Sequence, residues 1–263
     1  MTRIGLVQTS SRASIKANIS VVNHFAASAA EAGCDVLCFP ECFLTTYHPE
    51  QAAELAIASN SDYLIQISEI AIAQKLDILV GFMECNETAC YITHGIFRWD
   101  GSRDFYRKTH LGKKERLFFS AGNTLDIYTL SCGLQIGIQL CVETHYPDIT
   151  RTLALKGAEV IFAPHAIPRV SGDRQKIWNK YITARSYDNR VYLACCNLWD
   201  ESRFGGGILI TDPRGEAVEA CYKDAPQLLT CEIDRELVRR YRTPGDKRAS
   251  HYYPAMRRPE LYL

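Results

Sequence analysis

Residues 134–148 read LQIGIQLCVETHYPD, an apolar run that leads into a turn rich in polar residues. The run 134–140 predicts a β-strand, and residues 149–156 after the turn have helical character. In α/β proteins, ligand sites form at the carboxyl ends of strands that lead through a turn into a helix. Cys141 stands at this junction and is the first candidate for chemistry.

Alternating strand and helix patterns flank this stretch on both sides. Strands are expected at 3–8, 36–39, 78–82, 160–163, 191–197, 206–211, 217–221 and 228–233, and helices at 15–29, 62–75, 149–156 and 173–188. Two hairpins interrupt the alternation, one over 91–108 around the turn Asp100-Gly101, and one over 125–141. This mixture favours a layered α/β domain with mixed sheets over a simple parallel sheet.

The bulk composition is that of an ordinary globular chain. Its 263 residues suit one large α/β domain, and no linker occurs before residue 240. Thirty basic residues balance thirty acidic ones, so no net field would attract nucleic acid or an anionic membrane. The sequence has no apolar stretch of about 18 residues, so no membrane span is expected. The first 14 residues do not resemble a signal peptide. We therefore expect a small-molecule substrate and a cytoplasmic location.

The eleven cysteines are odd in number and irregularly spaced. Most of them lie in apolar runs, where a free cysteine behaves as a small buried hydrophobic residue: Cys34, Cys38, Cys195, Cys196 and Cys231. Without a secretion signal, the expectation is that all of them are reduced thiols. A reduced compartment would leave a catalytic thiol available.

Three residues suit covalent chemistry by type and position. Cys141 could attack a carbonyl while backbone N–H groups of its turn bind the oxyanion, although a buried structural cysteine has the same signature. Glu41 follows the apolar run 36–39, where desolvation would raise its pKa toward that of a general base; a solvated loop glutamate is the alternative. Lys108, at the end of a hairpin strand, could stabilise a thiolate and an oxyanion, or be an ordinary edge-strand charge.

Glu41, Lys108 and Cys141, taken together with the motifs around them, indicate a family more specifically than any one of them does. FPE at 39–41, YRKTHL at 106–111 and LCVETHYPD at 140–148 resemble, in order and separation, the three signature blocks of the nitrilase (carbon-nitrogen hydrolase) superfamily. Flanking segments at 3–9, 157–164, 184–197 and 257–262 are also similar to the family. The resemblance covers nearly the whole chain.

The resemblance implies a role for each matched residue and a fold. Cys141 would be the nucleophile, Glu41 the general base and Lys108 the oxyanion stabiliser, while Glu115 matches a second glutamate that orients the lysine and the substrate. The implied fold is a four-layer α-β-β-α sandwich with mixed sheets. Residues 1–240 would form the single hydrolase domain, and 241–263 an arm at the subunit interface of a homodimer or higher homo-oligomer.

Neither a cofactor nor a metal is implied, and the scattered histidines show no metal-ligand spacing. Candidate substrate contacts are Val142, which is smaller than the usual family residue, Glu143, His165 and Tyr47, each with a structural role as the alternative. Arg169, Arg174 and Arg185 could each bind a substrate carboxylate, or be solvated surface charges.

The leading functional hypothesis is hydrolysis of a small amide or N-carbamoyl compound through an acyl-enzyme on Cys141, with release of ammonia or an amine. The same residues could convert a nitrile to an acid, which makes a nitrilase the nearest alternative. N-acyl transfer to an amine, and a catalytically inactive scaffold, also remain open.

Overall fold

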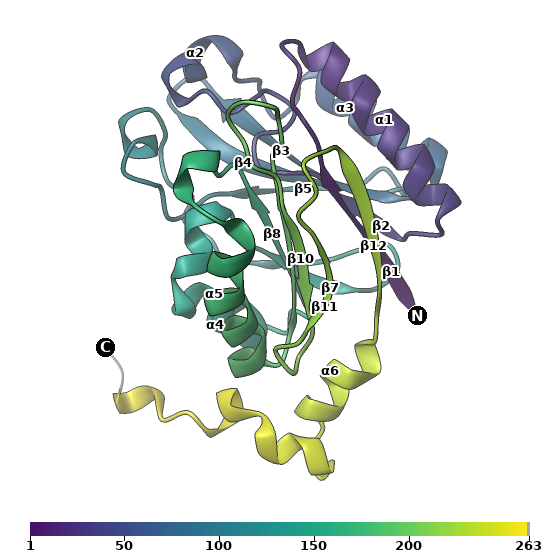
Figure 1. Ribbon diagram of the computed structural model, residues 1–263, viewed down its shortest axis with the longest axis vertical. Coiled ribbons are helices and arrows are strands. Elements are labelled where there is room, and N and C mark those ends of the chain that lie inside the picture. The colour runs from purple at the N-terminus through teal and green to yellow at the C-terminus, as the bar shows by residue number, and fades with distance from the viewer. Residues whose placement is uncertain (262–263) are drawn as a thin grey trace.

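The computed structural model describes residues 1–261 as two β-sheets stacked face to face, with helices on the two outer faces (Figure 1). The first sheet has the strand order β12 (Gln227–Ile233), β1 (Thr2–Gln8), β2 (Val36–Cys38), β3 (Asp77–Cys85), β4 (Cys90–Phe97) and β5 (Arg103–Arg107). Strands β1, β2 and β3 are parallel, and the other pairings are antiparallel. The predicted hairpin over 91–108 is β4 and β5.

The second sheet has the order β11 (Ala217–Cys221), β10 (Ile208–Thr211), β9 (Tyr192–Asn197), β8 (Val160–His165), β7 (Gln135–Ile138) and β6 (Ile127–Thr129). Strands β7, β8 and β9 are parallel, and the other pairings are antiparallel. Strand β7 ends at Ile138, earlier than the sequence predicts, and Cys141 begins a short 3-10 helix, η3 (Cys141–His145).

Amphipathic helices cover the outer faces. Helices α1 (Ile15–Glu31) and α3 (Asp62–Gln74) lie on the first sheet, and α4 (Pro147–Leu155) and α5 (Arg174–Asn189) lie on the second (Figure 1). The serines Ser14 and Ser61 accept hydrogen bonds from backbone N–H groups and cap the N-termini of α1 and α3. The shorter helices are α2 (Ala52–Leu55), η1 (Pro49–Gln51), η2 (Glu115–Leu117) and η4 (Arg169–Ser171).

The main apolar core lies between the sheets. Ile4 and Leu6 from β1 belong to the same buried cluster as Ile136 and Ile138 from β7, and all four are fully buried. Alternate residues such as Leu37 point to the helix-covered face, which explains why β2 is apolar on both sides. The predicted four-layer α-β-β-α sandwich with mixed sheets is confirmed.

The C-terminal segment begins with α6 (Arg235–Arg242) and continues through η5 (Lys247–His251), η6 (Tyr253–Met256) and η7 (Pro259–Leu261) at one end of the sandwich (Figure 1). The buried Arg190 holds it, because its guanidinium donates to the His251 carbonyl oxygen and lies over the rings of Tyr241 and Tyr253. Residues 262–263 of the predicted arm lie outside the described residues, and its contact with a second subunit stays a prediction.

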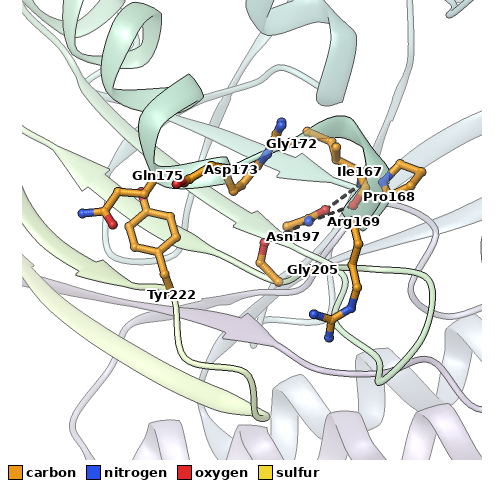
Figure 2. Close-up of a pocket in the computed structure, with 11 residues that line it drawn as sticks. Ile167, Pro168, Arg169, Gly172, Asp173, Gln175, Asn197, Gly205 and Tyr222 are labelled. Carbon is orange, nitrogen blue, oxygen red and sulfur yellow. Dashed lines mark hydrogen bonds between the residues drawn. The ribbon is translucent and has the colours of Figure 1, made fainter.

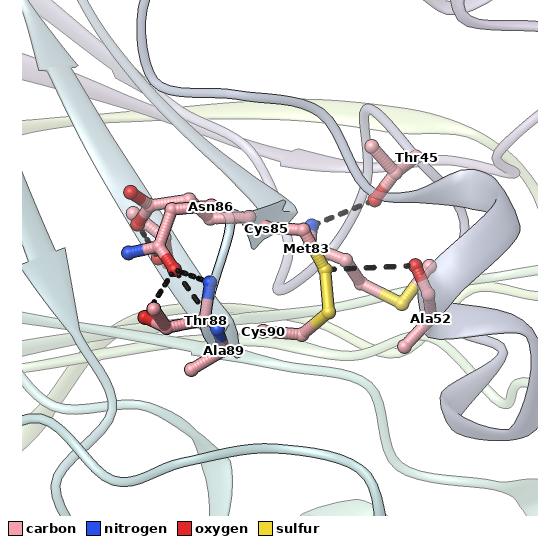
Figure 3. The surroundings of a disulfide bond; sticks show 10 residues. Thr45, Ala52, Met83, Cys85, Asn86, Thr88, Ala89 and Cys90 are labelled. Atoms are coloured by element: carbon pink, nitrogen blue, oxygen red, sulfur yellow. Dashed lines mark hydrogen bonds between the residues drawn. A yellow bond between two sulfur atoms is a disulfide. The ribbon is translucent and has the colours of Figure 1, made fainter.

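One prediction about the cysteines is wrong. Cys85 and Cys90 form a disulfide across the β3–β4 hairpin (Figure 3), whereas all thiols were expected to be reduced. The strand register places the two residues directly opposite each other, with Cα atoms 4.1 Å apart. The five cysteines assigned to apolar runs are buried and free, as predicted.

Within residues 1–261, no helix has the length and hydropathy needed to cross a bilayer.

Candidate active site

The turns that carry Glu41, Lys108 and Cys141 meet between the two sheets. Glu41 follows β2 and Lys108 follows β5, both in the first sheet, while Cys141 comes shortly after β7 in the second. Stacking of the sheets therefore joins three segments that are far apart in the sequence.

A chain of short hydrogen bonds links the charged residues. The Lys108 ammonium donates to Glu41 Oε1 at 2.7 Å and to Glu115 Oε1 at 2.9 Å. The Tyr47 hydroxyl donates to the same Glu115 oxygen at 2.8 Å, and the Gly112 N–H donates to Glu115 Oε2 at 2.6 Å. Lys108, Glu41 and Glu115 are all buried, so these ion pairs operate where water does not screen them. Tyr47 therefore contacts Glu115, and its contact with a substrate stays a prediction.

The Glu41 turn depends on Gly81 of β3. A Cβ atom at Gly81 would lie 2.5 Å from the Cys42 nitrogen and 2.9 Å from the Pro40 carbonyl oxygen. Only a glycine allows the turn to approach β3 this closely. Cys42 itself has a positive φ of 52°, so the chain reverses sharply right after Glu41.

Cys141 has a similarly constrained backbone, with a φ of 49° that is uncommon for a residue other than glycine. It is the first residue of η3, and the Thr144 hydroxyl donates to its carbonyl oxygen at 2.6 Å. The first N–H groups of a helix have no partner within it, and one of them here belongs to Val142. This amide is a donor beside the sulfur.

The protonation states suit a general base acting on a neutral thiol. Burial raises the pKa of Glu41 to about 7, against the opposing effect of the Lys108 ammonium. Burial and the Glu41 carboxylate raise the pKa of the Cys141 thiol, and they outweigh Lys108, so the ammonium does not produce a resting thiolate. Burial lowers the pKa of Lys108, but Glu41 and the other nearby anionic groups hold it well above its usual value.

The two oxygens of Glu41 differ in their contacts. Lys108 occupies Oε1, whereas Oε2 is buried and has no hydrogen-bond partner within residues 1–261. A buried acceptor without a partner is costly in a folded protein, and such atoms cluster where a substrate or a proton is to be bound. Oε2 is thus the oxygen available to take a proton.

Glu143 lies in a buried hydrogen-bond network beside Cys141. Its side chain is fully buried, and both carboxylate oxygens accept hydrogen bonds from the protein, including from the backbone N–H groups of Thr109 and Leu140. The carboxylate therefore joins the Lys108 segment to the Cys141 turn, and its contact with a substrate stays a prediction.

His165 ends β8 and packs against Trp178 of α5, with ring centroids 4.9 Å apart and the ring planes tilted by 54°. Burial lowers its pKa to about 3, so the imidazole is neutral. Nδ1 lies 2.7 Å from the Ala163 carbonyl oxygen, which requires the proton on Nδ1 and leaves Nε2 as an acceptor. Nε2 is buried without a partner in the described part of the chain. The predicted contact of His165 with a substrate stays a prediction.

A cavity of about 560 Å³ lies at the carboxyl ends of β8 and β9 (Figure 2). Asn197 shapes its wall by accepting from the Ile167 N–H at 2.7 Å and donating to the Ile167 carbonyl oxygen at 3.1 Å. Ile167 directly follows Ala166, whose backbone N–H lowers the pKa of the Cys141 thiol, so this wall begins next to Cys141. Its volume is in the range of small-molecule sites.

Two of the three candidate arginines line this cavity. Arg169 pairs with Asp224 at 2.6 Å and also donates to the Asp200 carbonyl oxygen. Arg174 donates to the Ser171 carbonyl oxygen at 3.2 Å and forms no ion pair with the described residues. Arg185 lies elsewhere on α5, and its buried Nε has no partner within the described range. Of the two arginines that line the cavity, Arg174 is therefore the better candidate for binding an anion.

Sequence reasoning missed Tyr106 and Gly81. Tyr106 lies in the YRKTHL block, and its hydroxyl donates to Glu143 at 2.8 Å. That partner is 37 positions away, so no local pattern reveals the bond. Gly81 lies inside an apolar strand, where a glycine can signal a close backbone approach. Residues 1–261 contain no group of three or more His, Cys, Asp or Glu side chains that could hold a metal ion.

Comparisons with known proteins agree with this geometry. Residues 3–243 match the family model described as carbon-nitrogen hydrolase. The chain is 31% identical to a hydrolase in the pqqF 5' region of Pseudomonas protegens, covering 99% of this chain and 90% of that protein. It is 25% identical to the N-carbamoylputrescine amidase of Solanum tuberosum, covering 94% and 89% of the two chains.

Among solved structures, the fold is similar to that of an amidase from Nesterenkonia sp. AN1, with a TM-score of 0.84, 24% identity, and coverage of 99% of this chain and 98% of that one. The chain belongs to the carbon-nitrogen hydrolase family, and it is a hydrolase that acts on carbon-nitrogen bonds.

Proposed function

We propose that the protein hydrolyses a small amide or N-carbamoyl compound through a covalent thioester on Cys141. The observation that supports this most directly is the buried Glu41 carboxylate, which has one oxygen bound by Lys108 and the other without a partner. With a pKa of about 7, this group can both take and return a proton near neutral pH.

In the first half of the reaction, Glu41 Oε2 takes the thiol proton as the Cys141 sulfur attacks the carbonyl carbon. The negative charge that develops on the carbonyl oxygen is stabilised by the Lys108 ammonium and the Val142 N–H. When the tetrahedral intermediate collapses, the carbon-nitrogen bond breaks and Glu41 gives its proton to the leaving nitrogen. Ammonia or an amine departs, and the thioester remains.

In the second half, Glu41 takes a proton from a water molecule, whose oxygen attacks the thioester carbon. The same two donors stabilise the second oxyanion. The carbon-sulfur bond then breaks, the sulfur regains a proton through Glu41, and the product acid leaves. Glu115 has no chemical step in this sequence, because its carboxylate holds Lys108 in place against Glu41.

The relatives are consistent with this substrate class. One curated relative is an N-carbamoylputrescine amidase and another is an (R)-stereoselective amidase. A variant of the Nesterenkonia amidase carries the acetamide moiety of fluoroacetamide covalently at its active-site cysteine. Arg174 in the cavity beside β8 suggests that substrates with a carboxylate deserve a place among those tested.

The decisive experiment measures ammonia or amine release from a panel of amides, N-carbamoyl compounds and nitriles, with mass spectrometry of the acid-quenched enzyme. We expect turnover of amides or carbamoyl compounds and an acyl group on the Cys141 peptide. Turnover of nitriles alone would replace the proposal by a nitrilase. An adduct that leaves only with an added amine would indicate acyl transfer, and neither product nor adduct would indicate a scaffold.

The resemblance to the family also leads us to propose that the protein is a homodimer or higher homo-oligomer. Light scattering coupled to size-exclusion chromatography tests this, and a monomer at micromolar concentration would contradict it.

A further inference from the structure

We propose that Glu143 is a positioning residue that keeps the Lys108 ammonium at a fixed position relative to Cys141. This inference rests on the proposed function, because it concerns how the two reacting groups are kept together. Glu143 lies two residues after Cys141, yet most of its partners come from the other sheet.

On the lysine side, three donors converge on one carboxylate oxygen. The backbone N–H of Thr109 lies 2.7 Å from Glu143 Oε1, the Thr109 hydroxyl lies 2.6 Å from it, and the His110 N–H lies 3.1 Å from it. Thr109 directly follows Lys108, so these bonds fix the backbone that carries the ammonium.

On the cysteine side, the Leu140 N–H donates to Glu143 Oε2 at 2.6 Å. Leu140 directly precedes Cys141, so the same carboxylate fixes the backbone that enters the nucleophile turn. The Tyr106 hydroxyl contacts both oxygens, at 2.8 and 2.9 Å, from the end of β5. One buried carboxylate thus contacts the residue after Lys108 and the residue before Cys141.

A neutral or shorter side chain in place of Glu143 could not make the same set of contacts. All the partners named above donate, so the NH₂ group of a glutamine would face a donor at one of the two oxygens. An aspartate is one methylene shorter and would not reach both segments. Hydrogen bonds from several donors to one buried charge are strong and directional, so they can fix the distance between two segments that belong to different sheets.

Asp77 provides a matched control. It is also fully buried, and it also joins the two sheets, by accepting from the Trp99 N–H at 3.0 Å and from the N–H and hydroxyl of Ser131, each at 2.7 Å. It lies at the start of β3, whereas the catalytic groups follow the ends of strands. Removing its charge therefore perturbs a similar buried network far from Cys141.

The kinetic test compares Glu143→Gln with Asp77→Asn for kcat, KM and melting temperature, on a substrate found in the panel. We expect Glu143→Gln to lower kcat roughly 10²-fold with KM changed only a few-fold, a loss comparable to that of an oxyanion contact. Asp77→Asn should lower the melting temperature and leave kcat within about twofold of the wild type. Equal losses of kcat in the two variants would overturn the proposal.

Should Glu143→Gln fail to fold, Tyr106→Phe and Thr109→Ala each remove a single donor to the carboxylate while leaving its charge. Each should lower kcat by a factor of roughly 3–10. Unchanged kcat in both of these variants would also overturn the proposal.

A second test needs no substrate: the rate at which iodoacetamide alkylates Cys141, followed by mass spectrometry of its peptide. Lys108 favours the thiolate of Cys141, so both Lys108→Ala and Glu143→Gln should slow alkylation. If Glu143 acts through Lys108, the double variant should react no more slowly than Lys108→Ala alone. If the two substitutions instead lower the alkylation rate additively in the double variant, the proposal is overturned. An absence of amidase turnover with this coupling intact would instead count against the proposed function only.

Discussion

The Lys108 ammonium lies 2.7 Å from Glu41 Oε1, and this bond leaves Oε2 as the free oxygen of the same carboxylate. One lysine therefore has two effects: it orients the Glu41 carboxylate and supplies positive charge near the Cys141 thiol. Because Glu115 also accepts from Lys108, the ammonium is held between two carboxylates whose charges keep it protonated.

Replacing the nucleophile should abolish turnover. Cys141→Ala and Cys141→Ser both remove the thiol that forms the covalent intermediate, so ammonia release should fall to background and no acyl adduct should form. Cys42→Ala is the matched control, because Cys42 is a buried free cysteine next to Glu41. Normal activity in Cys141→Ala would contradict the mechanism.

Lys108→Ala should lower kcat by roughly 10²–10³-fold, the loss typical of removing one oxyanion contact. Steady-state kinetics measure this. Lys113→Ala removes an exposed lysine from the loop that follows and should leave kcat unchanged. A near-normal rate for Lys108→Ala would exclude the ammonium from the chemistry.

Activity should rise with pH through about 7. Glu41 accepts a proton only as the carboxylate, and burial raises its pKa to about 7, so the protonated and inactive form dominates below that pH. The pH profile of kcat/KM should show this acidic limb. Lys108 should cause no loss near neutrality, since its pKa is held well above its usual value. If the acidic limb of kcat/KM lies instead near the ordinary pKa of a glutamate, a residue other than the buried Glu41 would be the base.

Gly81→Ala should disturb the Glu41 turn. The added methyl group would meet the Cys42 nitrogen at 2.5 Å, so the turn or β3 must move, at a cost of about 1–3 kcal/mol. We expect a lower melting temperature and a larger loss of kcat than stability alone explains. Gly205→Ala is the control for the melting temperature alone, because a methyl group there meets its neighbours at 3.4 Å or more, but Gly205 lines the cavity beside β8. Unchanged kcat in a folded Gly81→Ala protein would refute the prediction.

Arg174→Ala should distinguish substrates by charge. If the cavity beside β8 receives a carboxylate, this change should raise KM roughly tenfold or more for acidic amides, because a charge-assisted hydrogen bond is lost. Neutral amides of the same size should be unaffected. Arg169→Ala is a useful comparison, since the Arg169 charge is already paired with Asp224. Equal KM changes for acidic and neutral amides would remove Arg174 from substrate binding.

The sequence alone determined most of the elements, and it predicted which groups react. Apolar periodicity and turn residues such as Asp100-Gly101 are local properties, and they placed the strands that precede Glu41, Lys108 and Cys141. The order of the three blocks along the chain indicated the family, and the family model and relatives confirm that. Substrate identity and assembly stay predictions.

Only the tertiary structure decided how these groups act. The role that we propose for Glu143 rests on bonds to Tyr106 and Thr109, residues more than thirty positions away that reach it because two sheets stack. The disulfide between Cys85 and Cys90 depends on strand register, and the free oxygen of Glu41 depends on which atom Lys108 reaches. Periodicity fixes which face of an element is buried, but contacts between buried polar atoms are set by how the completed layers pack together.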